Sequence, residues 1–281
     1  MQYYVIQPPP EISCYVRNFW VLEGSVSKHE PFIHRVLADC CPEFIFYYKG
    51  AFQRINLNNR AENCFQSGIY GQTRLHTQYL VNEDFGIFGT YLYPYTITQL
   101  FNRPASELSD QYPDLKSLCG KEGEILEEKV VLAADNIQRA ELISEFLINR
   151  LYPADRRYSN IVNAIHKAIV WNQSYDINNL ACECNLSRRQ FERRFKEHSG
   201  FSPREFFKLV RFGHVIKNPS KAVKSLTETA LDCGYYDQSH FIRDFNKFSG
   251  IHQNNTLKIE AGLITKLPPS SILNMSQLYN F

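Results

Sequence analysis

The sequence lacks the features that mark membrane and secreted proteins. No stretch approaches the roughly 18 to 20 uninterrupted apolar residues of a membrane-spanning helix, and the opening MQYYVIQPPP has no basic start followed by an apolar run. The cysteines at positions 14, 40, 41, 64, 119, 182, 184 and 233 are scattered, so without a secretory leader we expect no disulfide framework. We therefore expect a cytoplasmic protein with reduced thiols and no membrane span.

Motifs for catalysis, metal binding and cofactor binding are also missing. The chain holds no Ser/His/Asp grouping and no glycine loop of the kind that cradles phosphates. Cys182 and Cys184 are two residues apart, and Cys40 and Cys41 are adjacent. Neither pair has a second pair or a histidine pair at zinc-site spacing. We expect no enzyme activity, no metal and no cofactor.

Charge is divided unevenly between the two halves of the chain. Residues 1–155 hold 13 basic against 19 acidic side chains, whereas residues 156–281 hold 18 basic against 10 acidic ones. A basic segment in a chain that is close to neutral as a whole indicates a nucleic-acid-binding part. A solvated basic surface is the other interpretation of the same charge.

The secondary-structure pattern predicts an α+β protein with two domains. The first hundred residues carry aromatic and β-branched runs broken by Gly, Asn and Pro, which is typical of strands and turns. From residue 122 to 151 the apolar residues recur at helical spacing. A proline and a charge cluster at 152–158 then interrupt the pattern. We predict a β-rich sensory domain with C-terminal helices over 1–155, an all-α domain over 156–258, and a flexible tail over 259–281.

The all-α domain contains a duplicated helix-turn-helix. FERRFKEHSG at 191–200 and FIRDFNKFSG at 241–250 share Phe, Phe, Ser and Gly at the same offsets, 50 residues apart. A short helix with a small residue, Ala181 or Ala230, precedes each copy. Asp176, Ser187 and Asp237 are predicted N-caps, and Gly200 is a predicted helix end. Two such units, each a bracing helix followed by a second helix, are expected.

The second helix of each unit has the residues that a DNA reader needs. Its phenylalanines pack inward, which leaves polar and basic side chains for the major groove, where the planar fork of arginine can bond guanine or grip a phosphate. The predicted DNA-contacting residues are Arg188, Arg189, Glu192, Arg193 and Lys196 in the first unit and Gln238, Ser239, Arg243, Asn246 and Lys247 in the second.

Residues 229–250, TALDCGYYDQSHFIRDFNKFSG, resemble the signature of the arabinose-operon-regulator family (AraC/XylS type). With the first unit and a linking helix at 204–217, the resemblance covers residues 160–258. It implies a transcription regulator whose single chain presents two recognition helices to successive major grooves of double-stranded operator DNA, with RNA polymerase as a further partner. One departure is that Gly200-Phe201-Ser202-Pro203 fits the family's step after the first unit, whereas the second unit reads Gly250-Ile251-His252-Gln253 without the proline.

The N-terminal half resembles, more diffusely, a domain of unassigned role found ahead of this module. The similar stretches are NFWVLE at 18–23, DCCPEFIF at 39–46, GIYGQ at 68–72 and FGTYLYP at 88–94. Its aromatics are interpreted either as plain core or as the walls of a pocket for a small-molecule effector. The residues of that predicted pocket are Trp20, Tyr47, Tyr48, Arg74, His76, Tyr91 and Tyr93. The helices at 122–151 could form a homodimer or brace the two domains.

Two other functions stay open at this point. Some proteins with this DNA-binding module also repair alkylated DNA through a reactive cysteine, for which Cys41 is the candidate. Its sequence neighbours Asp39 and Glu43 are acidic, however, and a reactive thiol needs an electropositive setting. A protein-interaction module with weak DNA binding is the second alternative.

Overall fold

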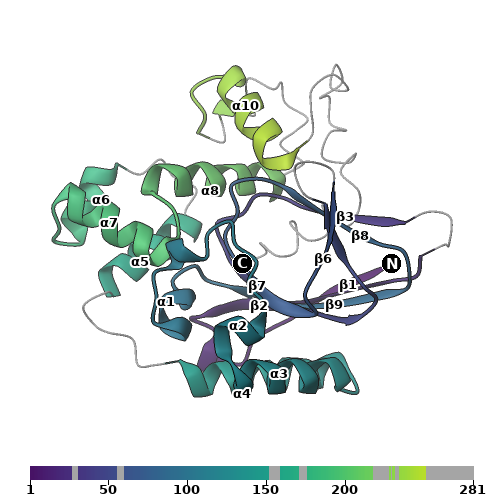
Figure 1. Ribbon diagram of the computed structural model, residues 1–281. Helices are drawn as coiled ribbons and strands as arrows, with labels where there is room; N and C mark the ends of the chain where they lie inside the picture. Colours follow the sequence, from purple (N-terminus) through teal and green to yellow (C-terminus); the bar gives the residue numbers. More distant parts are fainter. Residues whose placement is uncertain are drawn as a thin grey trace.

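The computed structural model describes residues 1–26, 31–55, 60–151, 159–170, 176–217, 228, 230–231 and 234–250. Nine strands in two antiparallel sheets make up most of the N-terminal half (Figure 1). The five-stranded sheet contains, in spatial order, β1 (Gln2–Ile6), β2 (Val16–Gly24), β9 (Phe85–Leu92), β4 (Glu43–Lys49) and β7 (Ser67–Tyr70). The four-stranded sheet contains β3 (Phe32–Val36), β8 (Thr77–Val81), β5 (Gln53–Ile55) and β6 (Ala61–Asn63).

Helices cover one face of the five-stranded sheet. Figure 1 shows α3 (Lys121–Leu132) and α4 (Asn136–Arg150) lying beside each other beneath that sheet. The smaller elements of this half are η1 (Pro10–Ile12), α1 (Thr96–Phe101), η2 (Ala105–Glu107) and α2 (Leu115–Cys119). The predicted helices at 122–151 are therefore confirmed, and their buried residues pack into the core of the N-terminal half and not between the domains.

The alternation of side chains along each strand divides the interior into two cores. On β4, Phe44 and Phe46 face the helices, whereas Ile45 and Tyr47 face the opposite way, because successive strand residues point to opposite faces. The first core, with Phe44, is closed by α3 and α4. The second core begins between the two sheets and continues into the C-terminal helices. One continuous apolar core therefore joins the two halves of the chain.

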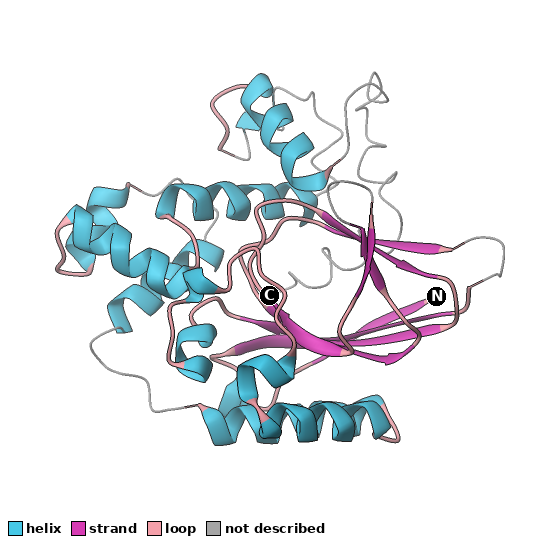
Figure 2. Ribbon diagram, viewed as in Figure 1, coloured by secondary structure: helices cyan, strands magenta, loops and turns pink. Residues whose placement is uncertain are grey.

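The described C-terminal part is all helix (Figure 2). Its named helices are α5 (Ser159–Val170), α6 (Ile177–Glu183), α7 (Arg188–Ser199), α8 (Pro203–Lys217) and α10 (Gln238–Ser249). The α+β class, with a β-rich half followed by helices, is confirmed. Among the described helices, none combines the length and the apolarity needed to cross a bilayer.

Some predictions fall outside the described residues. The domain boundary at 155/156 lies within 152–158, and the expected tail at 259–281 lies within 251–281. The altered step after Gly250 lies in that same C-terminal stretch. The predicted domain bounds therefore stay predictions.

Candidate nucleic-acid interface and internal cavity

Helix α7 begins and ends where local chemistry dictates. The hydroxyl of Ser187 accepts from the backbone N–H of Gln190, and the Gln190 side chain accepts in return from the backbone N–H of Ser187, which forms a capping box. The helix ends at Gly200, whose φ of 85° is the left-handed conformation that favours glycine. Phe191 and Phe195 are fully buried beneath it. The predicted cap, end and inner face of this helix are confirmed.

The outer face of α7 is polar and basic. Arg188, Arg189, Arg193 and Lys196 are exposed, and Glu192 is half-buried. Arg188 pairs with Glu192 at 3.0 Å (Nε to Oε1), one helical turn along. An exposed pair of this kind contributes little to stability, so the arginine can exchange it for a phosphate or a base at small cost.

Helix α10 repeats this arrangement in the second unit. Asp237 caps it by accepting from the backbone N–H of His240 at 2.7 Å, and Phe241 and Phe245 are buried beneath it. The predicted polar residues of this helix are exposed or half-buried: Gln238, Ser239, Arg243, Asn246 and Lys247.

The turn before each of these helices has the same geometry. Asn185 and Gly234 both have positive φ, 54° and 74°. The backbone N–H of the next residue, Leu186 or Tyr235, donates to the carbonyl of Ala181 or Ala230 at 2.9 Å in both cases. The two alanines are buried, at 2% and 0% exposure. Sequence periodicity and turn geometry therefore both describe two copies of one helix-turn-helix.

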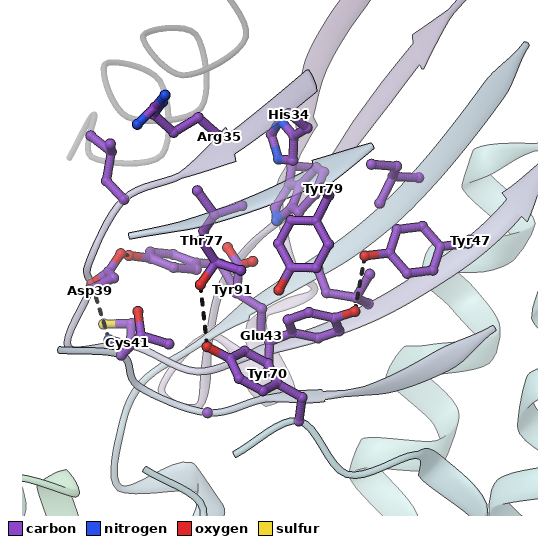
Figure 3. Close-up of a pocket in the computed structure, with 18 residues that line it drawn as sticks. His34, Arg35, Asp39, Cys41, Glu43, Tyr47, Tyr70, Thr77, Tyr79 and Tyr91 are labelled. Carbon is purple, nitrogen blue, oxygen red and sulfur yellow. Dashed lines mark hydrogen bonds between the residues drawn. The ribbon is translucent and has the colours of Figure 1, made fainter. Parts of the chain in front are cut away.

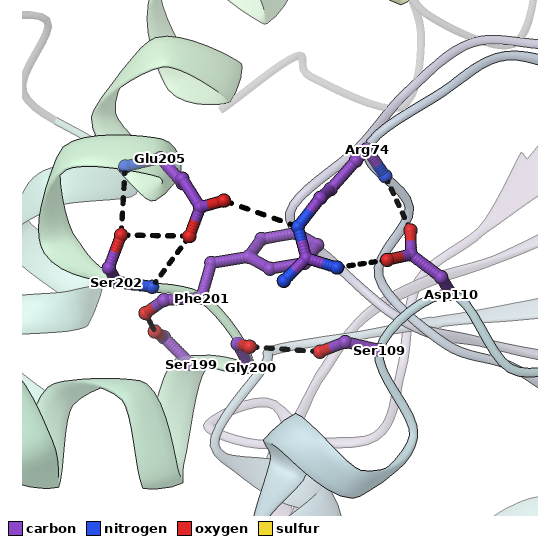
Figure 4. Close-up of polar contacts among 8 residues, drawn as sticks. All are labelled: Arg74, Ser109, Asp110, Ser199, Gly200, Phe201, Ser202 and Glu205. Carbon is purple, nitrogen blue, oxygen red and sulfur yellow. Dashed lines mark hydrogen bonds and ion pairs between the residues drawn. The ribbon is translucent and has the colours of Figure 1, made fainter.

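The end of the first unit is fixed to the N-terminal half. Gln72 donates to the Ser199 carbonyl at 3.1 Å, and the Ser109 hydroxyl donates to the Gly200 carbonyl at 2.9 Å. Figure 4 shows Arg74 between the two halves, where it pairs with Asp110 on one side and Glu205 on the other. Its guanidinium also lies over the Phe201 ring, 4.6 Å from the centroid.

The end of the second unit is fixed to a different part of the same half. The backbone N–H of Ala38 donates to the Phe248 carbonyl at 3.0 Å. Arg35 of β3 donates to the carbonyls of Ser249 and Gly250 at 3.3 and 3.4 Å. Both recognition helices are thus held at their C-terminal ends, while their N-terminal residues face solvent.

An internal cavity lies between the two sheets of the N-terminal half (Figure 3). It encloses a volume of about 60 Å³. Its lining residues are Trp20, His34, Arg35, Val36, Leu37, Asp39, Cys41, Glu43, Ile45, Tyr47, Tyr70, Gly71, Thr73, Thr77, Tyr79, Ile87, Tyr91 and Tyr112. Six of these 18 residues are tryptophan or tyrosine.

Three of the predicted pocket residues line this cavity: Trp20, Tyr47 and Tyr91. Tyr48 does not, because it follows Tyr47 on β4 and points to the opposite face, where the Arg139 guanidinium lies 3.9 Å from its ring centroid. Tyr93 packs instead against Tyr95 and, across the domain interface, against His166 of α5.

Arg74 and His76 were also placed wrongly by the sequence. Arg74 forms the interdomain ion pairs described above, and His76 lies against Gly250 at the end of the second unit. These positions depend on the packing of distant segments, for which the local sequence carries no pattern.

Sequence reasoning missed the acidic part of the cavity wall. Burial raises the pKa of Glu43 to about 8, the charge of Asp39 adds to this rise, and the nearby N–H group of the Trp20 indole opposes it only in part. The alternation Glu43, Ile45, Tyr47 along β4 was the pattern that could have identified Glu43, since it shares a face with Tyr47.

Asp39, Cys40 and Cys41 bring three potential metal-ligand atoms within 4.8 Å of one another. A tetrahedral zinc ion needs four ligands, and Asp39 already accepts from Tyr91 and from the backbone N–H of Cys41. The Cys41 thiol is buried, and Arg17 donates to it at 3.6 Å. A cation therefore does lie beside this thiol, which the acidic sequence neighbours of Cys41 had not indicated.

Comparisons with known proteins match two separate parts of the chain. Residues 4–114 match the family described as Domain of unknown function (DUF6597), and residues 180–258 match the family described as Helix-turn-helix domain. The HTH-type transcriptional regulator GbdR of Pseudomonas aeruginosa is 33% identical over 79 residues, which are 27% of this chain and 21% of that protein. The HTH-type transcriptional activator RhaS of Pectobacterium atrosepticum is 30% identical over 78 residues, 27% of this chain and 28% of that protein.

Solved structures of ToxT from Vibrio cholerae are similar over more of the chain but at low identity. One of them covers 86% of this chain and 98% of its own, with 12% identity and a TM-score of 0.46. The aligned segments of the curated relatives GbdR and RhaS each make up less than a third of that relative's own length.

Proposed function

We propose that the chain is a sequence-specific DNA-binding transcription regulator of the AraC/XylS type, because residues 180–258 match a helix-turn-helix family and the similar curated proteins are transcription regulators. The observation that carries the proposal is the repeated unit itself. Two capped helices bury their phenylalanines and leave their N-terminal turns and basic side chains facing solvent. A major groove admits such a helix, and base edges there can be bonded by its polar side chains.

We assign base and phosphate contacts to the outward side chains of both helices. Gln238 and Arg243 suit adenine and guanine, since an amide or a guanidinium can bond two atoms of those bases. Arg189, Arg193, Lys196 and Lys247 are exposed cations placed for phosphates or bases. Such a protein must act where the genome is, so we place it in the cytoplasm.

We further propose that the N-terminal half controls DNA binding through a small-molecule effector or a partner. The cavity and the second unit share a structural element: β3 and the loop after it supply Arg35 and Asp39 to the cavity wall, and Arg35 and Ala38 to the contacts with α10. A change in cavity occupancy can therefore alter the support of a recognition helix.

A second copy of the chain and RNA polymerase are the protein partners that this function would involve. Exposed apolar side chains on α3 and α4 suit contact with a second copy: Ile125, Leu132, Ile137 and Ile148, with exposures of 42, 74, 57 and 47%. Sedimentation of the full chain across a range of concentrations would detect such a dimer.

The decisive experiment is selection of bound duplexes from a random DNA pool by the full chain, at low and at physiological salt. We expect one enriched motif with two sub-sites separated by about one helical turn, roughly 10 base pairs, because two recognition helices read one face of the duplex. If no sequence is enriched and binding disappears at physiological salt, the proposed function is wrong.

A further inference from the structure

The cavity between the sheets is lined by several tyrosines, and most of their hydroxyl groups are hydrogen-bonded within the wall. The hydroxyls of Tyr47 and Tyr70 bond each other at 3.0 Å, and those of Thr77 and Tyr112 bond each other at 3.3 Å. The Tyr91 hydroxyl donates to Asp39. These groups are therefore occupied with one another, and a neutral, hydroxyl-rich ligand would have to break those bonds.

The acidic groups of the cavity wall are carboxyl groups, and Glu43 becomes negatively charged as the pH rises through its pKa of about 8. Asp39 and Glu43 contribute carboxyl groups to its wall, and in Figure 3 the Arg35 side chain points away from the rings, toward the carbonyls at the end of α10. His34 is fully buried, and burial lowers its pKa to about 4, so near neutral pH it carries no charge. Two further cations lie outside the wall: Arg17 over the Tyr91 ring and Arg54 over the Tyr112 ring, 4.9 and 4.6 Å from the ring centroids, and neither is a lining residue.

Glu43 differs from Asp39 in its partners. Asp39 accepts hydrogen bonds from Tyr91 and from the backbone of Cys41. For Glu43, no ion pair occurs among the residues that the structure describes. An unpaired carboxylate in such a setting is costly, and a ligand that brings a positive charge would remove that cost.

We propose that this cavity binds a small organic cation, a protonated amine or a quaternary ammonium group, with Glu43 as its counter-charge and the rings of Trp20, Tyr47 and Tyr79 against its faces. The electron-rich face of an aromatic ring attracts a cation, most strongly where water is excluded. An anion would instead meet two carboxyl groups. The volume suits a small molecule, because about 10 to 15 Å³ of such space holds one water.

This proposal names the chemical class of the effector that was proposed above to control DNA binding. Only the consequence of ligand binding, a change in DNA binding, rests on the proposed function. Its test is isothermal titration calorimetry of the full chain with choline and with 3,3-dimethylbutan-1-ol, which has the same shape but no charge. Tetramethylammonium, propylammonium and the anion pivalate extend the series. The titrations are done at a pH of about 9, where the Glu43 carboxyl is ionised.

We expect at least one cation to bind at least about tenfold more tightly than the neutral analogue and pivalate, a difference of about 1.4 kcal/mol. Glu43→Gln should remove most of that preference while keeping the shape of the cavity. Glu23→Gln is the matched control, because Glu23 lies on the opposite face of the same sheet beside Tyr48 and Asn136.

Thermal unfolding of each variant shows whether it folds. Tyr79→Leu is a second cavity variant, which removes an aromatic ring without changing the charge of the cavity. Equal or tighter binding of the neutral or anionic analogue, no binding by any cation, or an unchanged preference in both cavity variants would each overturn the proposal. Because the titrations contain no DNA, such a failure would leave the proposed DNA-binding function standing. Failure of the duplex selection would in turn leave cation binding intact.

Discussion

One exposed arginine on each of the helices α7 and α10 provides the test of DNA recognition at single residues. Arg188→Ala and Arg243→Ala should each weaken binding to the selected operator by about 1 to 3 kcal/mol, because each removes a two-pronged contact to a base or a phosphate. Competition binding with the selected duplex and a scrambled duplex measures both affinity and specificity.

Arg103→Ala is the matched control for these variants, since Arg103 is an exposed arginine of the N-terminal half. It should leave the affinity unchanged. Wild-type affinity in both recognition-helix variants would remove our assignment of α7 and α10, whatever the control shows.

A second prediction at this scale concerns Glu43 and pH. Its pKa is about 8 in the folded chain against 4.5 when exposed, so the folded state holds a proton that the unfolded state has lost between those values. Stability should therefore fall as pH rises from about 4.5 to about 8, by roughly 1 to 3 kcal/mol for a carboxyl that is only partly exposed. Glu43→Gln should abolish this part of the fall.

Chemical unfolding of the wild type and of Glu43→Gln at several pH values measures the free energy of unfolding, with Glu23→Gln as the control. The titratable groups around Glu43 include Tyr3, Asp39 and Cys41, its cross-strand neighbours Tyr70 and Tyr91, and His34 and Arg35 of the cavity wall, and all are retained in the variant. His34 and His198, whose pKa values burial lowers to about 4, cause a separate loss as pH falls below 6.5. A difference between wild type and Glu43→Gln that stays constant across the range would contradict the prediction.

At the scale of helices and strands, the features that the sequence predicted are those set by a few neighbouring residues. Ser187 and Asp237 bond backbone N–H groups within their own first turn, and Gly200 supplies a conformation that other residues avoid. Strand faces were predictable in principle as well. Tyr47 and Tyr48 cannot both line one cavity, and applying the two-residue period to β4 would have replaced Tyr48 by Glu43.

Substitution of Arg74 tests the contact between α8 and the N-terminal half, because Arg74 pairs with Glu205 of α8. Arg74→Ala should lower the free energy of unfolding by about 1 kcal/mol, since it removes partly exposed ion pairs and the stacking on Phe201. It should also increase amide hydrogen exchange at 201–206. Hydrogen exchange with mass spectrometry reads this segment directly.

Arg54→Ala is the control for that experiment. Arg54 likewise pairs with a carboxylate, Glu62 at 2.8 Å, and lies 4.6 Å from the centroid of a ring, Tyr112, but all three residues belong to the N-terminal half. Equal exchange at 201–206 in the two variants would show that Arg74 does not fix the first unit.

For the whole molecule, the sequence predicted two functional halves but not how they are joined. The core that begins between the sheets continues into the helix-turn-helix units, and Arg74, His76 and Tyr93 lie at the junction. Each of these contacts pairs residues that are 70 or more positions apart, so no local periodicity reveals them. The sequence suggested these three as pocket residues because aromatic and polar side chains occur both in ligand pockets and at contacts between domains.

We expect this junction to link the proposed effector cavity and the proposed DNA-binding helices thermodynamically. If a bound cation changes DNA affinity by some factor, bound DNA must change cation affinity by the same factor, which is typically about 5- to 150-fold in coupled proteins. Arg35 is the direct connection, since it lines the cavity and donates to the carbonyls of Ser249 and Gly250.

Arg35→Ala should therefore bring that factor closer to one, whether the cation strengthens or weakens DNA binding. Fluorescence anisotropy with a labelled operator, with and without saturating cation, measures the factor, and Arg103→Ala, which alters an exposed arginine that does not line the cavity, should preserve it. An unchanged factor in Arg35→Ala would mean that the coupling runs through the apolar core instead of through β3.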